Sequence, residues 1–227
     1  MKKRPIEYQE KEENAFSMST GDLMAGLLFI FILLLMGALL RVQEKAEEDD
    51  QIVQRYDQLK TQLYIDLQEE FKDDLTVWRA TIDSTLCVRF QEPSMLFSLN
   101  LATLKPLFKE ILDDFFPRYI KVLKRPDYKN DIIEIRIEGH TDSTGDYFYN
   151  MQLSQDRTRT VLQYCFNLME EDEKQWAKSI ITANGLSSSQ PIILDGKEDR
   201  DLSRRVEFRV RTNAEKQLEK IATKIRK

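Results

Sequence analysis

Two carboxylates in this sequence stand where an ionisable side chain can do chemistry, Asp22 and Asp142. Asp22 precedes an apolar run, from Leu23 to Leu40, that contains no charged residue and ends at Arg41. At about 1.5 Å per residue, this segment is long enough to cross a hydrocarbon core about 30 Å thick. An ionisable side chain inside such a span is costly, so Asp22 is the first candidate functional residue, with a role in carrying protons.

A structural role for Asp22 is the alternative. In the first turn of the predicted span, its carboxylate would cap free backbone amides and complement the helix dipole, which is worth up to about 1 kcal/mol. On a helix, however, Asp22 shares a face with Ala25, Gly26 and Phe29. Small residues on a face let a second helix approach closely, so this face predicts a neighbouring membrane helix.

The second carboxylate, Asp142, lies in a loop between a predicted strand and a predicted helix. Arg157, which we place about one turn into that helix, offers a planar fork for a carboxylate. Asp142 can accept hydrogen bonds from an ammonium group. A facing pair of this kind could recognise an amino-acid head group, which carries both charges. On spacing alone, an ordinary surface salt bridge explains the two residues equally well.

Composition excludes several classes of function. A formal net charge of −5 and a pI near 5.2 argue against nucleic-acid binding. His140 is the only histidine, and Cys87 and Cys165 follow no metal spacing, so we expect no metal site and a structural His140. No nucleophile–base pair is apparent, so we expect no enzyme, no catalytic residue and no cofactor. The two cysteines either form a disulfide, if the domain lies in an oxidising compartment, or stay buried free thiols.

The chain order predicts five segments. We expect a cytoplasmic tail (1–16), a transmembrane helix (17–40), a helical connector (41–83), a domain (84–212) and a charged C-terminal helix (213–227). The connector is predicted because apolar residues recur at steps of three or four from Ile52 to Trp78, and we read one helix from Gln43 to about Ile82.

Within the domain, strand and helix alternate. Strands are predicted at 86–90, 132–138, 180–183 and 206–210, and helices from Pro106 and after Ser154. In the second strand, Ile133, Ile135 and Ile137 would share the buried face. The fold class is therefore α/β (α+β), with a small mixed sheet.

The loop and the helix after it resemble the OmpA-like peptidoglycan-binding domain. The pattern is carried by Gly139, Thr141, Asp142 and Gly145, then by Asn150, Leu153, Ser154 and Arg157, and then by Arg204, Arg205, Val206 and Glu207. The resemblance covers about residues 86–211. It implies that Asp142 and Arg157 hold the diaminopimelate head group of the stem peptide. It also implies that Thr141, Tyr149, Asn150 and Leu153 shape the binding groove.

A span with an N-terminal Asp, a helical connector and such a domain together resemble MotB-type stator subunits. Ser19, Thr20 and Gly21 before Asp22, and the residues 23–26 after it, resemble the ZorB family of the Zorya anti-phage defence system more than flagellar MotB. The resemblance implies a homodimer inside a ring of five MotA-like, ZorA-like multi-span subunits, with ions passing Asp22.

The same resemblance implies a location and a mechanism. It places the chain in the bacterial inner membrane, with the N-terminus cytoplasmic and the C-terminal domain periplasmic and bound to peptidoglycan. The coupling ion is expected to be the proton, because the apolar run after Asp22 offers no polar side chain to complete the coordination of a sodium ion. Sodium stays an alternative, because the hydroxyl groups of Ser19 and Thr20 precede Asp22. A static membrane-to-wall tether and a flagellar-type MotB stator are the alternatives.

Overall fold

A computed structural model describes residues 6–91, 93–98 and 100–213, and the chain forms two compact units, Met1–Ile52 and Val53–Lys227. Helix α1 (Ile6–Phe71) makes up the described part of the first unit and continues into the second. The predicted C-terminal helix lies outside the described residues, apart from Asn213, as do residues 1–5 of the predicted tail.

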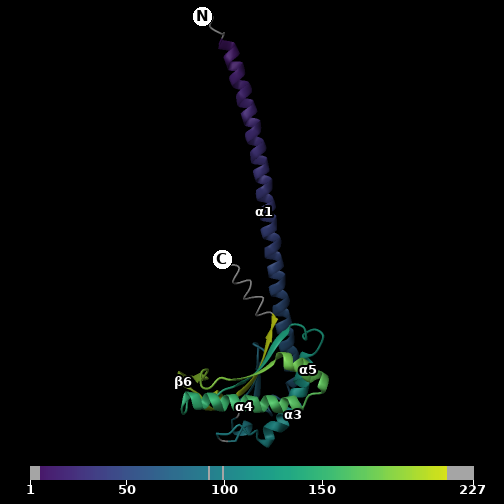
Figure 1. Cartoon of the computed structure of the whole chain (residues 1–227), viewed down its shortest axis with the longest axis vertical. Coiled ribbons are helices and arrows are strands. Elements are labelled where there is room, and N and C mark those ends of the chain that lie inside the picture. Colours follow the sequence, from purple (N-terminus) through teal and green to yellow (C-terminus); the bar gives the residue numbers. More distant parts are fainter. Residues whose placement is uncertain (1–5, 92, 99, 214–227) are drawn as a thin grey trace. The chain divides into compact units, whose positions relative to one another are not determined.

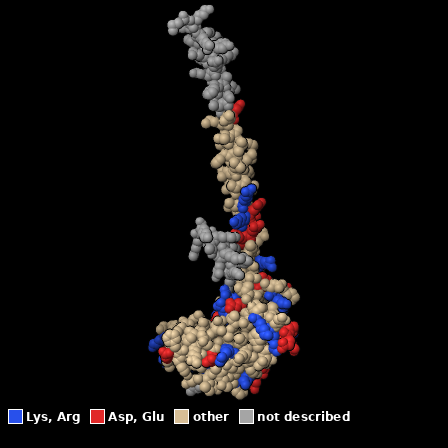
Figure 2. Space-filling view, viewed as in Figure 1, with Lys and Arg blue, Asp and Glu red and all other residues tan. Residues whose placement is uncertain are grey.

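The first unit carries the predicted membrane span. Within the described residues, α1 is the one helix long and apolar enough to cross a membrane, and its most apolar window has a mean hydropathy of 2.9 with none of it buried. Figure 2 shows this window as an uncharged stretch of the helix that is followed by a cluster of charged side chains.

The start of α1 corrects the predicted tail. The helix begins at Ile6 and not at residue 17, because no helix-breaking residue follows Pro5 and the Glu- and Lys-rich segment favours a helix. Asp22 therefore lies more than four turns inside α1, where backbone amides are already bonded within the helix. The alternative role for Asp22, capping a helix terminus, is wrong.

The end of α1 corrects the predicted connector. The helix stops at Phe71, turns follow, and residues expected to be helical form strand β1 (Ala80–Asp83). Arg79 has a φ of 48°, and the amide of Ala80 bonds back to the carbonyl of Leu75. The turn brings the Trp78 ring to 5.7 Å from Phe71, between ring centroids. Tertiary packing has overridden the helical spacing, and the second unit begins well before Ser84.

The second unit is a layer of helices on a five-stranded sheet (Figure 1). The strand order is β1-β2-β7-β3-β4, and β3 and β4 pair in parallel while the other neighbours are antiparallel. The predicted strands are confirmed as β2 (Cys87–Phe90), β3 (Ile132–Gly139), β4 (Ile181–Gly185) and β7 (Val206–Thr212). The remaining strands, β5 (Ile193–Leu194) and β6 (Lys197–Glu198), form a separate hairpin.

One face of the sheet is apolar and packs on helices. The predicted helix at Pro106 is confirmed as α3 (Pro106–Leu123), and its Phe115 ring lies 5.1 Å from the rings of both Phe90 and Phe208, between centroids. In β3, Ile135 and Ile137 are buried as predicted, but Ile132 replaces Ile133 as the third buried residue. The register of β3 against β7 shifts between Ile132 and Glu134, which reverses the alternation there.

Helix α4 (Tyr147–Asn167) begins seven residues before Ser154, after which the helix was predicted to start. Asp146 caps it, because its carboxylate accepts from the amides of Phe148 (2.9 Å) and Tyr149 (3.0 Å). Arg157 is thus in the third turn and not the first. Three further helices that the sequence did not reveal are α2 (Pro93–Leu96), α5 (Glu171–Ile180) and α6 (Arg200–Ser203).

Two glycines let α4 approach the sheet. Gly139 and Gly185 are paired in the parallel β3–β4 register, at the end of both strands. A Cβ at Gly185 would lie 2.3 Å from the backbone nitrogen of Gln155, and one at Gly139 would lie 2.6 Å from Thr158 Cγ2. This close packing fixes the first half of α4 beside the end of β3, where the candidate site lies.

Both cysteines are free and buried. Of the two alternatives left open by the sequence, the structure contains the free thiols and not the disulfide. Cys165 belongs to the apolar core beneath α4, whereas Cys87 lies on the polar face of the sheet.

Candidate functional site

A groove of about 670 Å³ opens where β3 ends and α4 begins. All six residues predicted to bind peptidoglycan line it: Thr141, Asp142, Tyr149, Asn150, Leu153 and Arg157. Residues that were not predicted to bind the ligand also line it, among them Phe97, Asn100, Lys105, Arg200 and Arg204. The arrangement brings one acidic and several basic side chains to the same cavity.

Asp142 supplies the negative charge of the groove. Its carboxylate accepts from the amide of Thr144 (2.8 Å) and forms an ion pair with Arg204. Burial alone would raise the pKa of Asp142, but the hydrogen bonds from Arg204 and Thr144 lower it below its ordinary value. Arg204 belongs to the Arg-Arg-Val-Glu motif that the sequence analysis identified. That motif could have been used to predict Arg204 as a residue of the site.

Arg157 lies in the same groove and pairs with no carboxylate in the part of the chain that the structure describes. Its Nε donates to the carbonyl of Leu101 (3.0 Å), and its guanidinium stacks on the Phe97 ring, 4.8 Å from the centroid. Burial lowers the pKa of Arg157. Among the described residues no ion pair joins Arg157 to Asp142, so the two do not form the surface salt bridge that spacing alone allowed. A guanidinium held this way, with both terminal nitrogens unengaged by a carboxylate, favours an anionic ligand.

Hydrogen bonds with α4 and with Ser187 hold the loop that carries Asp142. The Asn150 side chain donates to the carbonyls of Thr144 (2.9 Å) and Asp142 (3.4 Å), which fixes the loop to the first turn of α4. The amide of Thr141 bonds to the carbonyl of Ser187 (3.0 Å). The Thr141 hydroxyl is buried and finds no hydrogen-bond partner among the described residues, so it is available to a ligand in the groove.

Ser187 connects this loop to α4. Its φ is 51°, a left-handed conformation that usually favours glycine. The buried Ser187 amide bonds to the hydroxyl of Ser154 (3.0 Å), and the Ser187 hydroxyl donates to the carbonyl of Tyr147 (2.9 Å). These bonds offset part of the cost of the backbone conformation and fix the start of α4 against the groove.

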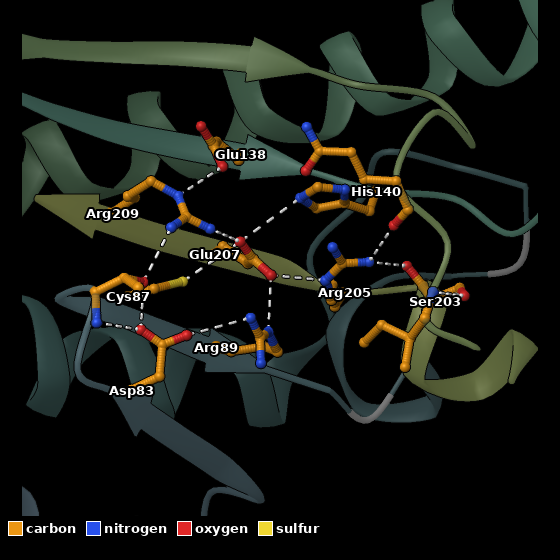
Figure 3. A network of polar contacts seen from close by, with 12 residues as sticks. Asp83, Cys87, Arg89, Glu138, His140, Ser203, Arg205, Glu207 and Arg209 are labelled. Carbon is orange, nitrogen blue, oxygen red and sulfur yellow. Dashed lines mark hydrogen bonds and ion pairs between the residues drawn. The ribbon is translucent and has the colours of Figure 1, made fainter. Parts of the chain in front are cut away.

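The polar face of the sheet carries a second cluster, centred on Glu207 of β7 (Figure 3). Glu207 accepts from Arg89 Nε (2.7 Å), Arg205 Nε (2.7 Å), Arg209 Nη2 (2.7 Å) and the thiol of Cys87 (3.3 Å). Burial alone would raise the pKa of Glu207, but hydrogen bonds from Arg205 and Arg89 hold it far below its ordinary value. The cluster is an ion-pair network that joins β2 to β7.

His140 borders this network and was expected to be structural. Its ring lies with Glu138 and Glu207, and the potential ligand atoms of the three residues are within 4.8 Å of one another. The two carboxylates, however, already form ion pairs with Arg209 and Arg205. The negative charge of the carboxylates is therefore already neutralised, and the guanidinium groups would repel a divalent cation. The residues fit an ion-pair network and not a metal centre.

Comparison with known proteins gives both a domain family and relatives of the whole chain. Residues 96–205 match the OmpA family. The chain is 46% identical over 224 residues to the Zorya protein ZorB of Escherichia coli strain ATCC 8739, a match that covers 94% of each chain. The chain belongs to the ZorB family. A further Zorya protein ZorB, from Escherichia coli O139:H28, is 24% identical, and the match covers 88% of this chain and 82% of that protein.

A solved structure supports the fold of this ZorB-family chain. The putative MotB-like protein from Desulfovibrio vulgaris has a TM-score of 0.51 and 21% identity, and the match covers 72% of this chain and 98% of that one. At this identity the likeness shows the fold alone. The family and fold predicted from the residues around Asp22 and Asp142 are confirmed.

Proposed function

We propose that this chain is the peptidoglycan-anchored subunit of a proton-driven rotary motor in the inner membrane, and that the motor serves defence against phage. The observation that carries the proposal is the groove beside α4, which is lined both by the anionic Asp142 and by a half-buried Arg157 that pairs with no carboxylate among the described residues. Membership of the ZorB family supports the phage-defence role, and Asp22 in the apolar part of α1 supports the ion-carrying role.

The groove suits the head group of diaminopimelate, which carries a carboxylate and an ammonium on one carbon. Arg157 would bind the carboxylate through its terminal nitrogens, and Asp142 would accept from the ammonium beside the bond it already receives from Thr144. The buried Thr141 hydroxyl would gain the hydrogen bond it lacks. Each charge of the ligand would thus meet a side chain of opposite charge, and its ammonium would share the Asp142 carboxylate with Arg204.

The membrane part of the proposal rests on Asp22. A carboxyl group that binds a proton at one access path and releases it at another can convert proton flow into steps of rotation. The open space beside Gly21 and Gly26 lets partner helices approach the face that carries Asp22. We infer a homodimer inside five copies of a multi-span, ZorA-like subunit, with the N-terminus cytoplasmic and the domain periplasmic.

Binding of the full chain to purified peptidoglycan sacculi tests the groove. Arg157→Ala should weaken cosedimentation about 10- to 100-fold, because a charge-assisted pair worth about 1.5–3 kcal/mol is lost. Arg159→Ala is the matched control, because Arg159 is exposed on the same helix and its one ion pair among the described residues is with Asp156, and it should bind like the unchanged chain. If the Arg157 variant binds sacculi as tightly as the unchanged chain, the groove is not the peptidoglycan-binding site.

Protection against phage separates the motor from a static tether. Asp22→Asn keeps the size of the side chain but cannot exchange a proton, so it should abolish protection while the complex with the multi-span subunit still purifies intact. A tether needs no proton carrier. Full protection by the Asn variant would favour the tether, and copurification would show whether assembly was preserved.

A further inference from the structure

Three consecutive aromatic residues begin α4, and all are exposed. Tyr147, Phe148 and Tyr149 expose 46%, 77% and 52% of their surface. Large aromatic side chains in a row at the surface mark an interaction site more often than chance exposure does. Tyr149 lines the groove described above, so the aromatic row begins at the wall of that groove and extends away from it.

The first turn of α4 holds these rings in place. The Asp146 carboxylate accepts from the amides of Phe148 and Tyr149, and the Tyr147 carbonyl accepts from the buried Ser187 hydroxyl. The rings of Tyr147 and Phe148 meet edge to face, with centroids 5.6 Å apart and planes at 82°. Their backbone is fixed by hydrogen bonds on both sides, so the rings form a preorganised surface.

We propose that Tyr147 and Phe148 form a platform for the glycan strand of peptidoglycan, next to the groove that takes the stem peptide. This inference rests on the proposed function of the groove. Sugar rings have apolar C–H faces and polar edges, which matches aromatic faces flanked by a tyrosine hydroxyl. The strand is recognised as a polymer of uncharged sugar rings.

Distance supports this occupant. Diaminopimelate is the third residue of the stem peptide, and an extended chain spans at most about 3.6 Å per residue, so a head group in the groove is joined to the strand by at most about 11 Å of peptide backbone and one side chain. Phe148 is the chain neighbour of the groove-lining Tyr149, with Cα atoms about 3.8 Å apart. The glycan strand must therefore pass close to the groove wall, and the aromatic row is a surface that extends from that wall.

A protein partner would use a different set of residues. The hairpin β5–β6 exposes Ile193 (53%) and Leu194 (51%), and the amide of Ser143 in the groove loop bonds to Glu198 of that hairpin (3.0 Å). A second protein docked on this end of the domain would cover aliphatic and aromatic residues together. Sugar rings stack on aromatic faces and gain little from a branched aliphatic side chain, so Ile193→Ala is the matched control.

The test compares two probes on the full chain in detergent micelles. One probe is the free stem peptide with its diaminopimelate head group, and the other is the intact sacculus. Phe148→Ala should leave the affinity for the peptide within about twofold and weaken binding to sacculi about two- to tenfold, with a further loss when Tyr147→Ala is added. Ile193→Ala should leave binding of both probes unchanged.

Each other outcome has a distinct meaning. Unchanged binding to sacculi by the Phe148 variant overturns the platform and leaves the groove intact. An equal loss for both probes assigns the rings to the peptide groove and overturns the platform. A loss from Ile193→Ala that equals the loss from Phe148→Ala, with a change in oligomeric state, shows a contact between proteins instead. If the unchanged chain binds neither probe, the proposed function of the groove fails, and the platform fails with it.

Discussion

His140, the one histidine of the chain, makes the stability of the domain depend on pH. Burial, and then the positive charge of Arg205, lowers the pKa of His140 from 6.5 to about 4. Its side chain is 1% exposed, and neither ring nitrogen has a hydrogen-bond partner among the described residues. The folded domain therefore holds a neutral imidazole that the unfolded chain would protonate.

The sign and size of the effect follow from this difference. Between pH 6.5 and pH 4 the unfolded chain binds more protons than the folded one, so the free energy of unfolding falls as the pH falls. A difference of about 2.5 in pKa corresponds to about 3 kcal/mol in full. About 2 kcal/mol of this loss should appear between about pH 7 and about pH 5, above the range in which most carboxylates titrate.

Urea unfolding of the full chain in detergent micelles, followed by the fluorescence of Trp78 and Trp176, which both pack in or against the core of the domain, measures this loss. His140→Gln cannot take up a proton, so the free energy of unfolding of this variant should change little over the same pH range. The imidazole can also be followed directly by NMR, where a single histidine should titrate near pH 4. An equal loss in the Gln variant, or a midpoint near the ordinary value, would refute the reasoning.

Three other substitutions test the packing that positions the groove, each through the change in the free energy of unfolding. Phe115→Ala should lower it by about 3–5 kcal/mol, since a ring at the centre of the aromatic core is lost. Glu207→Gln should lower it by about 3–5 kcal/mol, because three arginines lose their shared counter-ion. Gly185→Ala should lower it by roughly 1–3 kcal/mol, because its Cβ would lie 2.3 Å from the Gln155 backbone. A change below about 0.5 kcal/mol at any of these positions would contradict the packing described for it.

Local patterns were sufficient to predict the long span and the strands β2, β3, β4 and β7, but not β1 or the hairpin β5–β6. Apolar and charged residues alternate along β3 and β7, and this pattern agrees with the structure to within a few residues, because a period of two is a strong local signal. Proline near the first turn gave the start of α3. The start of α4 was missed because Asp146, its cap, lies in a polar loop where a short acidic side chain has several possible roles.

Features that depend on distant contacts could not be read from spacing. Trp78 continues the apolar stripe of α1 but packs back on Phe71 after a turn, so the stripe predicted a helix where the chain reverses. In the site, Asp142 and Arg157 were predicted as a pair, but which cation contacts Asp142 depends on Arg204, which is distant in sequence. The orphaned Thr141 hydroxyl likewise appears only when the loop and Ser187 are seen together.

The central claim is that Asp22 carries protons through a motor that the domain anchors to the wall, and cytoplasmic pH tests it most directly. In cells that express this chain with its multi-span partner, a pH-sensitive fluorescent protein should report acidification of the cytosol after phage infection. Asp22→Asn should abolish that signal while the purified complex keeps its composition. Equal acidification with the Asn variant, or protection by the unchanged chain without any proton entry, would contradict the account.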